Sequence, residues 1–124
     1  MKTFMLAFTL CLLINKAFTQ NESPKEIKAI KVPDFTDASV KSFYQSYADH
    51  LLKCVGAIRE KNEVKVKALF KNPGEELVAR EKLISKETVK NPVEKQKYME
   101  FAALVYPYLK EVQQSEYYKK MYGK

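Results

Sequence analysis

The feature that most limits the fold is a long stretch of apolar side chains that recur at steps of three and four. The stretch follows Asp37 and comprises Val40, Phe43, Tyr44, Tyr47, Leu51, Cys54, Val55 and Ile58. Residues at this spacing lie on one face of an α-helix, so the pattern predicts a long amphipathic helix. We expect it to begin after a cap at Asp34 or Thr36 and to run to about Lys61. The apolar residues that follow also fit a longer helix that continues to Asn72.

Two further segments show the same helical spacing. One covers residues 73–90 and carries Leu77, Val78, Leu83, Ile84 and Val89, and the other runs from Pro92 to Tyr118 or beyond. Asn91 alone separates them, so we expect a short turn between long helices. Pro107 lies inside the last segment and is predicted to kink it, because proline lacks an N–H and crowds the carbonyl four residues earlier.

Three short sequences of the form Ser/Asn-Pro-x-Glu, beginning at Ser23, Asn72 and Asn91, are typical of helix starts. The Ser or Asn oxygen can accept a free backbone N–H, proline tolerates the first helical position, and the glutamate can bond back to the cap. The first of them predicts a short helix over residues 24–30. The expected fold is therefore all-α: an up-and-down bundle of about three long helices plus this short N-terminal helix, with the last helix kinked at Pro107.

The N-terminus has the order of charge and apolar residues that is typical of a secretory signal peptide. Lys2 precedes a run over residues 4–14 that is apolar apart from Thr9, and Ala17 and Thr19 supply small residues before Gln20. The run is much shorter than the roughly 20 apolar residues that a transmembrane helix needs. We therefore predict a cleavable signal peptide over residues 1–19, no transmembrane anchor, one helical domain over residues 20–124, and a secreted or periplasmic location.

The composition of the mature chain argues against nucleic-acid binding. Removal of Lys2 and Lys16 lowers the net charge from +7 to +5, and the chain contains only two arginines, Arg59 and Arg80. Proteins that bind phosphates and base edges favour clustered arginines, and the lysines here are scattered among glutamates. Removal of Cys11 with the signal leaves Cys54 as the one cysteine, which excludes an intrachain disulfide and favours a role as core filler.

His50 and Cys54 are the one pair that suggests reactive chemistry, because residues four apart share a helical face. A thiol enzyme also needs an orienting group and an oxyanion site, and zinc needs about four ligands, whereas the mature chain has no second His or Cys. We interpret the pair as structural. The sequence predicts no catalytic residue, no metal ligand and no cofactor, and the protein is not expected to be an enzyme.

Tyrosines are the candidate contact residues, because a large ring with a hydroxyl suits partly hydrated surfaces. Those near the C-terminus that we assign to a possible partner or ligand contact are Tyr106, Tyr108, Tyr117, Tyr118 and Tyr122. Their default role is packing at the edge of the core.

The leading hypothesis is a non-enzymatic protein-binding or interaction module of the cell envelope or extracellular space, with an unknown protein partner. The alternative is a carrier that holds a small apolar ligand between its helices, with Met99, Phe101, Phe70 and the tyrosines as walls. A Cys54-dependent enzyme or redox protein is the third hypothesis.

Overall fold

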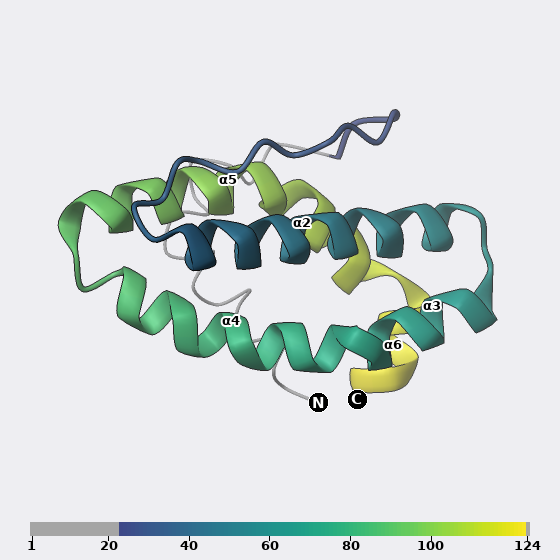
Figure 1. The fold of residues 1–124 in the computed structure, drawn as a ribbon. Helices are drawn as coiled ribbons and strands as arrows, with labels where there is room; N and C mark the ends of the chain where they lie inside the picture. The colour runs from purple at the N-terminus through teal and green to yellow at the C-terminus, as the bar shows by residue number, and fades with distance from the viewer. Residues whose placement is uncertain (1–22, 124) are drawn as a thin grey trace.

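The computed structural model describes residues 23–123, and these residues are all-α. The helices are α2 (Ala38–Arg59), α3 (Glu63–Leu69), α4 (Glu75–Thr88), α5 (Pro92–Gln114) and α6 (Glu116–Tyr122). A kinked turn, η2 (Phe70–Gly74), joins α3 to α4. α2, the joined α3–α4 span and α5 run in alternating directions (Figure 1). The predicted up-and-down bundle with three long helical spans is confirmed.

α2 begins later than predicted, and it ends at Arg59, close to the predicted Lys61. Its N-cap is Asp37 rather than Asp34 or Thr36, and the Asp37 carboxylate accepts a 2.8 Å hydrogen bond from the backbone N–H of Ser39. At the other end Lys61 has a positive φ of 58°. The N–H groups of Lys61 and Asn62 donate to the carbonyls of Ile58 and Ala57, which closes the helix in a Schellman-type turn. The helix therefore does not continue to Asn72.

The predicted helix start at Asn72 is wrong. Asn72 and Pro73 have non-helical φ and ψ and form a kink within η2, and the peptide bond between them is cis. α4 begins two residues after Pro73, at Glu75, and its N-cap position, Gly74, has no side chain to cap it. Gly74 also packs closely, because a Cβ at this position would lie 2.6 Å from the Leu69 carbonyl oxygen. The absence of a side chain at Gly74 therefore lets the backbone of α4 approach that of α3 closely at this turn.

The predicted cap of the last long helix is confirmed at Asn91, whose side-chain oxygen accepts from the N–H groups of Val93 and Glu94. Glu94 does not bond back to its cap. It accepts instead from the backbone N–H of Thr36 at 2.9 Å and from the Thr36 hydroxyl at 3.1 Å. α5 continues through Pro107 and changes direction in its second half (Figure 1), and Ser115 ends it and caps α6.

The predicted helix over residues 24–30 is wrong, because the N-terminal segment, residues 23–37, forms no helix. It crosses α2 and α5 in an extended path, drawn in dark blue in Figure 1. Its apolar side chains Ile30, Val32 and Phe35 are buried in the core. Burial of these three side chains against helices contributes more than the few hydrogen bonds of a one-turn or two-turn helix. The capping residues of this segment are also used elsewhere, as described below.

The core contains a cluster of aromatic rings centred on Tyr44 of α2. The ring of Tyr44 lies 4.8 Å from that of Phe101 and 5.1 Å from that of Phe35, measured between centroids. Phe101 and Phe70, both expected as walls of a ligand cavity, are buried in this core and contact other rings. Packing of this kind joins α2, α5 and the N-terminal segment into one hydrophobic cluster.

The predicted signal peptide, residues 1–19, lies outside the described residues. Within residues 23–123, none of the helices combines the length and the apolar character that a membrane crossing requires.

Candidate binding groove

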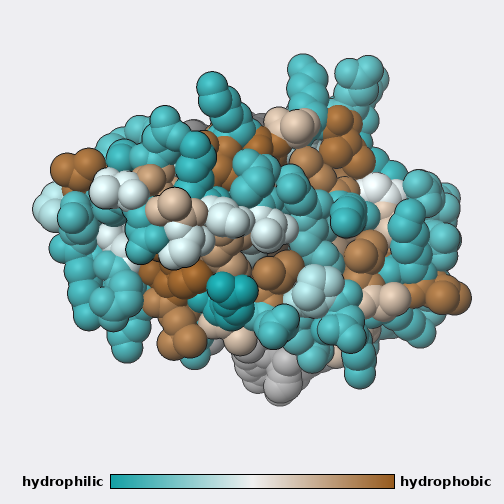
Figure 2. Space-filling view, viewed as in Figure 1, coloured by the Kyte–Doolittle hydropathy of each residue, from teal (hydrophilic) through white to brown (hydrophobic). Residues whose placement is uncertain are grey.

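A groove runs along the outer side of α5, beside the N-terminal segment. It consists of three hollows in a row. The middle hollow shares Pro107 with the first, and it shares Ala103 and Leu104 with the third. Their volumes are about 460, 530 and 460 Å³, taken from the Ser115 end of α5 toward Glu100. Figure 2 shows apolar side chains at the surface between projecting hydrophilic ones along the top of the molecule, where the N-terminal segment runs in Figure 1.

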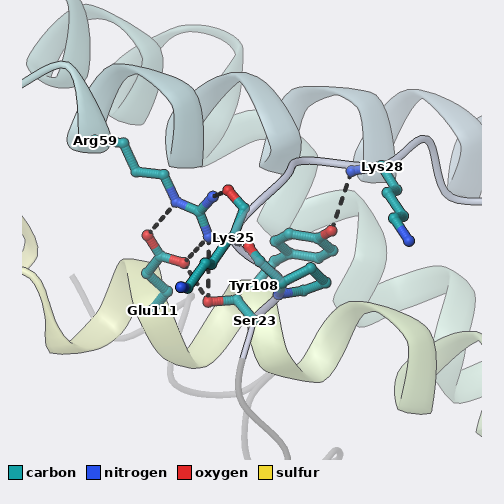
Figure 3. Close-up of polar contacts among 7 residues, drawn as sticks. Ser23, Lys25, Lys28, Arg59, Tyr108 and Glu111 are labelled. Atoms are coloured by element: carbon teal, nitrogen blue, oxygen red, sulfur yellow. Dashed lines mark hydrogen bonds and ion pairs between the residues drawn. The ribbon is translucent and has the colours of Figure 1, made fainter.

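Arg59, in the last turn of α2, lies at the end of the groove that Ser23 and Ser115 line (Figure 3). Its Nε and Nη2 donate to the two carboxylate oxygens of Glu111 at 2.9 and 2.8 Å, which is the bidentate geometry of a strong ion pair. Nη1 and Nη2 also donate to the backbone carbonyls of Lys25 and Pro24 at 2.6 and 2.7 Å. One guanidinium therefore ties α2, α5 and the N-terminal segment together.

Glu111 completes this cluster from α5. The hydroxyl of Ser23 donates to the same carboxylate, so the residue expected to cap an N-terminal helix binds a helix far away in sequence. The hydrogen bond from Arg59 is the main cause that lowers the pKa of Glu111, while partial burial acts in the opposite direction. Glu111 is therefore ionised and paired at neutral pH, and it adds no net negative charge to the groove.

Tyr108 is the predicted contact residue that the structure places in the groove. Its hydroxyl accepts a 3.2 Å hydrogen bond from the backbone N–H of Lys28, and its buried ring lines the hollow beside Pro107 (Figure 3). Tyr106 is also buried, but it does not line these hollows. The two tyrosines that flank Pro107 in sequence therefore do not form a joint site.

The other three predicted tyrosines, Tyr117, Tyr118 and Tyr122, lie on α6, which follows the C-terminal end of α5. The rings of Tyr118 and Tyr122 lie 5.1 Å apart and both contact Phe70. The Tyr122 hydroxyl donates to Glu75 at 3.1 Å, which joins α6 to α4. Tyr117 is partly buried against the core. These residues hold α6 onto the bundle, and the structure does not bring them together with Tyr106 or Tyr108.

His50 and Cys54 lie in the core of the bundle, with Sγ 3.5 Å from Nε2. Burial raises the pKa of the Cys54 thiol to about 12 and lowers the pKa of His50. A thiol with this pKa is protonated at neutral pH and is a poor nucleophile. Cys54 is fully buried, as expected of a core filler.

The sequence reasoning missed Glu81, a buried carboxyl group on α4. Its Oε2 accepts a 2.8 Å hydrogen bond from the Tyr98 hydroxyl. Burial raises the pKa of Glu81 to about 7, against the opposing effect of hydrogen bonds from Tyr98 and Ser85. The sequence did contain a sign of its burial. Glu81 follows Val78 by three residues and Leu77 by four, which places it on the same helical face as these apolar side chains.

Residues 23–123 contain no group of three His, Cys, Asp or Glu side chains placed to hold a metal ion. Comparisons with protein-family models, with curated proteins and with solved structures find no match to this chain. The groove is therefore the feature on which a functional argument rests.

Proposed function

We propose that this protein is exported from the cytoplasm and acts as a non-enzymatic binding protein whose partner occupies the groove along α5. The observation that carries the proposal is the continuity of the three hollows, which together follow the groove side of α5 from Glu100 to Ser115. Concave, partly apolar surfaces with a few fixed polar groups are preferred binding sites in proteins.

Two further properties support this proposal. The N-terminal segment, which forms one side of the groove, is attached to the helices that it crosses, since Arg59 and Tyr108 bond its backbone. Leu104 projects from the groove side of α5 and is 47% exposed, which leaves a large apolar side chain in contact with water. A partner that covers Leu104 removes this apolar area from water, and such burial is the main favourable contribution to most protein association.

Site-directed photo-crosslinking in the source organism tests the proposal. We expect a photoreactive phenylalanine analogue at Leu104 to give one discrete adduct in the compartment where the protein resides. The same analogue at Leu83, which is 67% exposed on α4, serves as the matched control and should give none. Equal adduct patterns from the two positions, or no adduct from either, would contradict a groove-specific partner. A lipid-sized mass retained in native mass spectrometry would instead support a carrier.

Export is tested separately by the mass of the protein recovered from the organism. We expect a mature chain that begins at Gln20 or Asn21, recovered outside the cytoplasm. Recovery of the full chain with Met1 from the cytoplasm would contradict this part of the proposal.

A further inference from the structure

We propose that the partner is an extended peptide segment in which apolar and acidic residues alternate, and that it lies along residues 28–32 in the groove. This inference rests on the proposed function and specifies the chemistry of the partner. Three observations on the described residues carry it: an extended stretch in which the backbone groups of Ala29 and Lys31 have no partner among residues 23–123, lysines without an ion pair there, and an apolar floor.

The first observation concerns the backbone of residues 28–32. These residues form no helix and follow an extended path in Figure 1. Ile30 and Val32 are buried in the core while Ala29 and Lys31 are exposed, which is the alternation of a half-buried strand. Ala29 and Lys31 both line the groove, and their N–H and C=O groups form no hydrogen bond with the described residues. An exposed stretch with open backbone donors and acceptors can bind a second extended chain by strand addition.

The second observation concerns charge. Lys28 and Lys31 line the groove and form no ion pair with the described residues, and the Lys28 ammonium group points away from the Arg59 cluster in Figure 3. Two acidic groups of the lining are already neutralised, because Asp34 pairs with Lys41 and Glu111 pairs with Arg59. Glu100 remains as the opposing charge. The groove therefore has an excess of positive charge that complements carboxylates on a partner.

The third observation concerns the floor of the groove. Ala103, Leu104 and Pro107 of α5 lie opposite residues 28–31 and supply apolar surface. Successive side chains of an extended peptide point to opposite sides, so a peptide placed here directs every second residue toward this floor and the others outward, where the lysines lie. The occupant that fits has apolar residues at one set of alternate positions and acidic residues at the other. A bilayer surface offers anionic groups to the lysines but no backbone partner to Ala29 and Lys31.

The direct test measures the binding of synthetic probes to the mature protein by fluorescence anisotropy. The supporting result is binding of an end-blocked peptide of alternating valine and glutamate, with markedly weaker binding of the valine and lysine counterpart. Methylation of the backbone nitrogens on one edge of the first peptide removes N–H donors and should weaken binding about fivefold, the effect of a single net hydrogen bond.

Protein variants locate the site. Exchange of Lys28 and Lys31 for glutamate in the same chain should weaken binding of the valine and glutamate peptide about tenfold, and more at low salt than at high salt. The control of equal charge change exchanges Lys82 and Lys86 on α4 for glutamate. This variant should bind like the unmodified protein, since both lysines are exposed and lie outside the groove. All variants should retain the helical circular dichroism and cooperative melting of the unmodified protein.

Three results would overturn the inference: equal binding of the acidic and basic peptides, insensitivity to the two lysine exchanges, or binding to vesicles that contain phosphatidylglycerol but to neither peptide. The crosslinking experiment separates this failure from failure of the proposed function. If Leu104 gives a specific adduct but neither peptide binds, the proposed function stands and the partner has a different chemistry from the one inferred here.

Discussion

The hydroxyl of Tyr98 on α5 donates a 2.8 Å hydrogen bond to Oε2 of Glu81 on α4, inside the core. Glu81 is 2% exposed, so its carboxyl group is separated from water. Burial disfavours the ionised form, which is why the pKa of Glu81 rises to about 7 from its usual 4.5. The relationship between these two residues makes the stability of the protein depend on pH.

Glu81 binds a proton in the folded protein at pH values where the unfolded chain has released it. The contribution of Glu81 to the free energy of unfolding should therefore be highest below about pH 4.5. This contribution should be lost as the pH rises through about 7. Glu81→Gln keeps an acceptor for Tyr98 and removes the ionisation, so it should stabilise the protein at pH 8 by about 2 to 3 kcal/mol and have little effect at pH 4. Urea titrations at both pH values measure this, with the exposed Glu76→Gln as control. Equal effects of Glu81→Gln at the two pH values would contradict the expected ionisation.

Cys54 should react with thiol reagents only when the protein unfolds, because it is fully buried and its pKa is raised to about 12. Labelling with Ellman's reagent at pH 8 should be slow in buffer and complete within seconds in guanidinium chloride. A reducing agent should leave the melting temperature unchanged. Fast labelling of the folded protein would show that the thiol is accessible.

Lys61→Gly should raise the free energy of unfolding by about 0.5 to 1 kcal/mol, because glycine adopts the positive φ of this position without the steric cost of a Cβ. The control is Lys61→Ala, which removes the charge but retains the Cβ and should give no gain. Denaturant titrations of the two variants compare these effects. Equal stabilisation by alanine and glycine would assign the effect to charge.

Arg59→Lys should lower the free energy of unfolding by about 1 to 2 kcal/mol, since an ammonium group cannot donate to Glu111 in bidentate fashion and also reach the carbonyls of Pro24 and Lys25. Arg80→Lys is the matched control. It keeps a cation above the Phe43 ring, 4.9 Å from the arginine carbon in the unmodified protein, and should cost less. Thermal melts rank the two. A larger loss for Arg80→Lys would contradict the role assigned to Arg59.

Pro107→Ala should leave the protein equally stable or make it more stable, because alanine restores the N–H that can bond the carbonyl of Ala103. It should also weaken the Leu104 crosslink, since Pro107 lines two of the three hollows and shapes α5 beside them. The control is Pro92→Ala at the first position of the same helix. Unchanged crosslinking in Pro107→Ala would make Pro107 a packing residue without a role in binding.

The helical periodicity predicted the three long spans well and the faces of α4 less well. Leu83 was assigned to the apolar stripe of α4, yet it is exposed, whereas Glu81, Ser85 and Thr88 are buried. The buried face of α4 differs from the apolar stripe because polar residues can be buried when they have hydrogen-bond partners. Glu81 is bonded by Tyr98, and Thr88 donates to the Ile84 carbonyl. Such partners come from other elements or the local backbone and are invisible to a count of apolar residues.

The groove was harder to predict because one side of it is the N-terminal segment. The sequence of this segment resembles a helix start, but its structure is set by contacts with residues far along the chain. Ser23, Pro24 and Glu26 match a helix start, but Ser23 binds Glu111 and the Pro24 carbonyl binds Arg59. Tertiary contacts therefore override the local preference. Of the five tyrosines assigned from the sequence, Tyr108 reached the groove, because its place on α5 beside the N-terminal segment is set by the fold and not by aromatic content.

The attachment of the N-terminal segment to α5 has a consequence for biosynthesis. Ser23 contacts a residue 88 positions later, Lys28 contacts one 80 positions later, and Thr36 contacts one 58 positions later. The part of the described chain that leaves the ribosome first thus binds to the long helix that leaves it last. These three contacts can form only after Glu94, Tyr108 and Glu111 have been translated, so the N-terminal segment reaches its native place on α5 only after most of the described chain has been made.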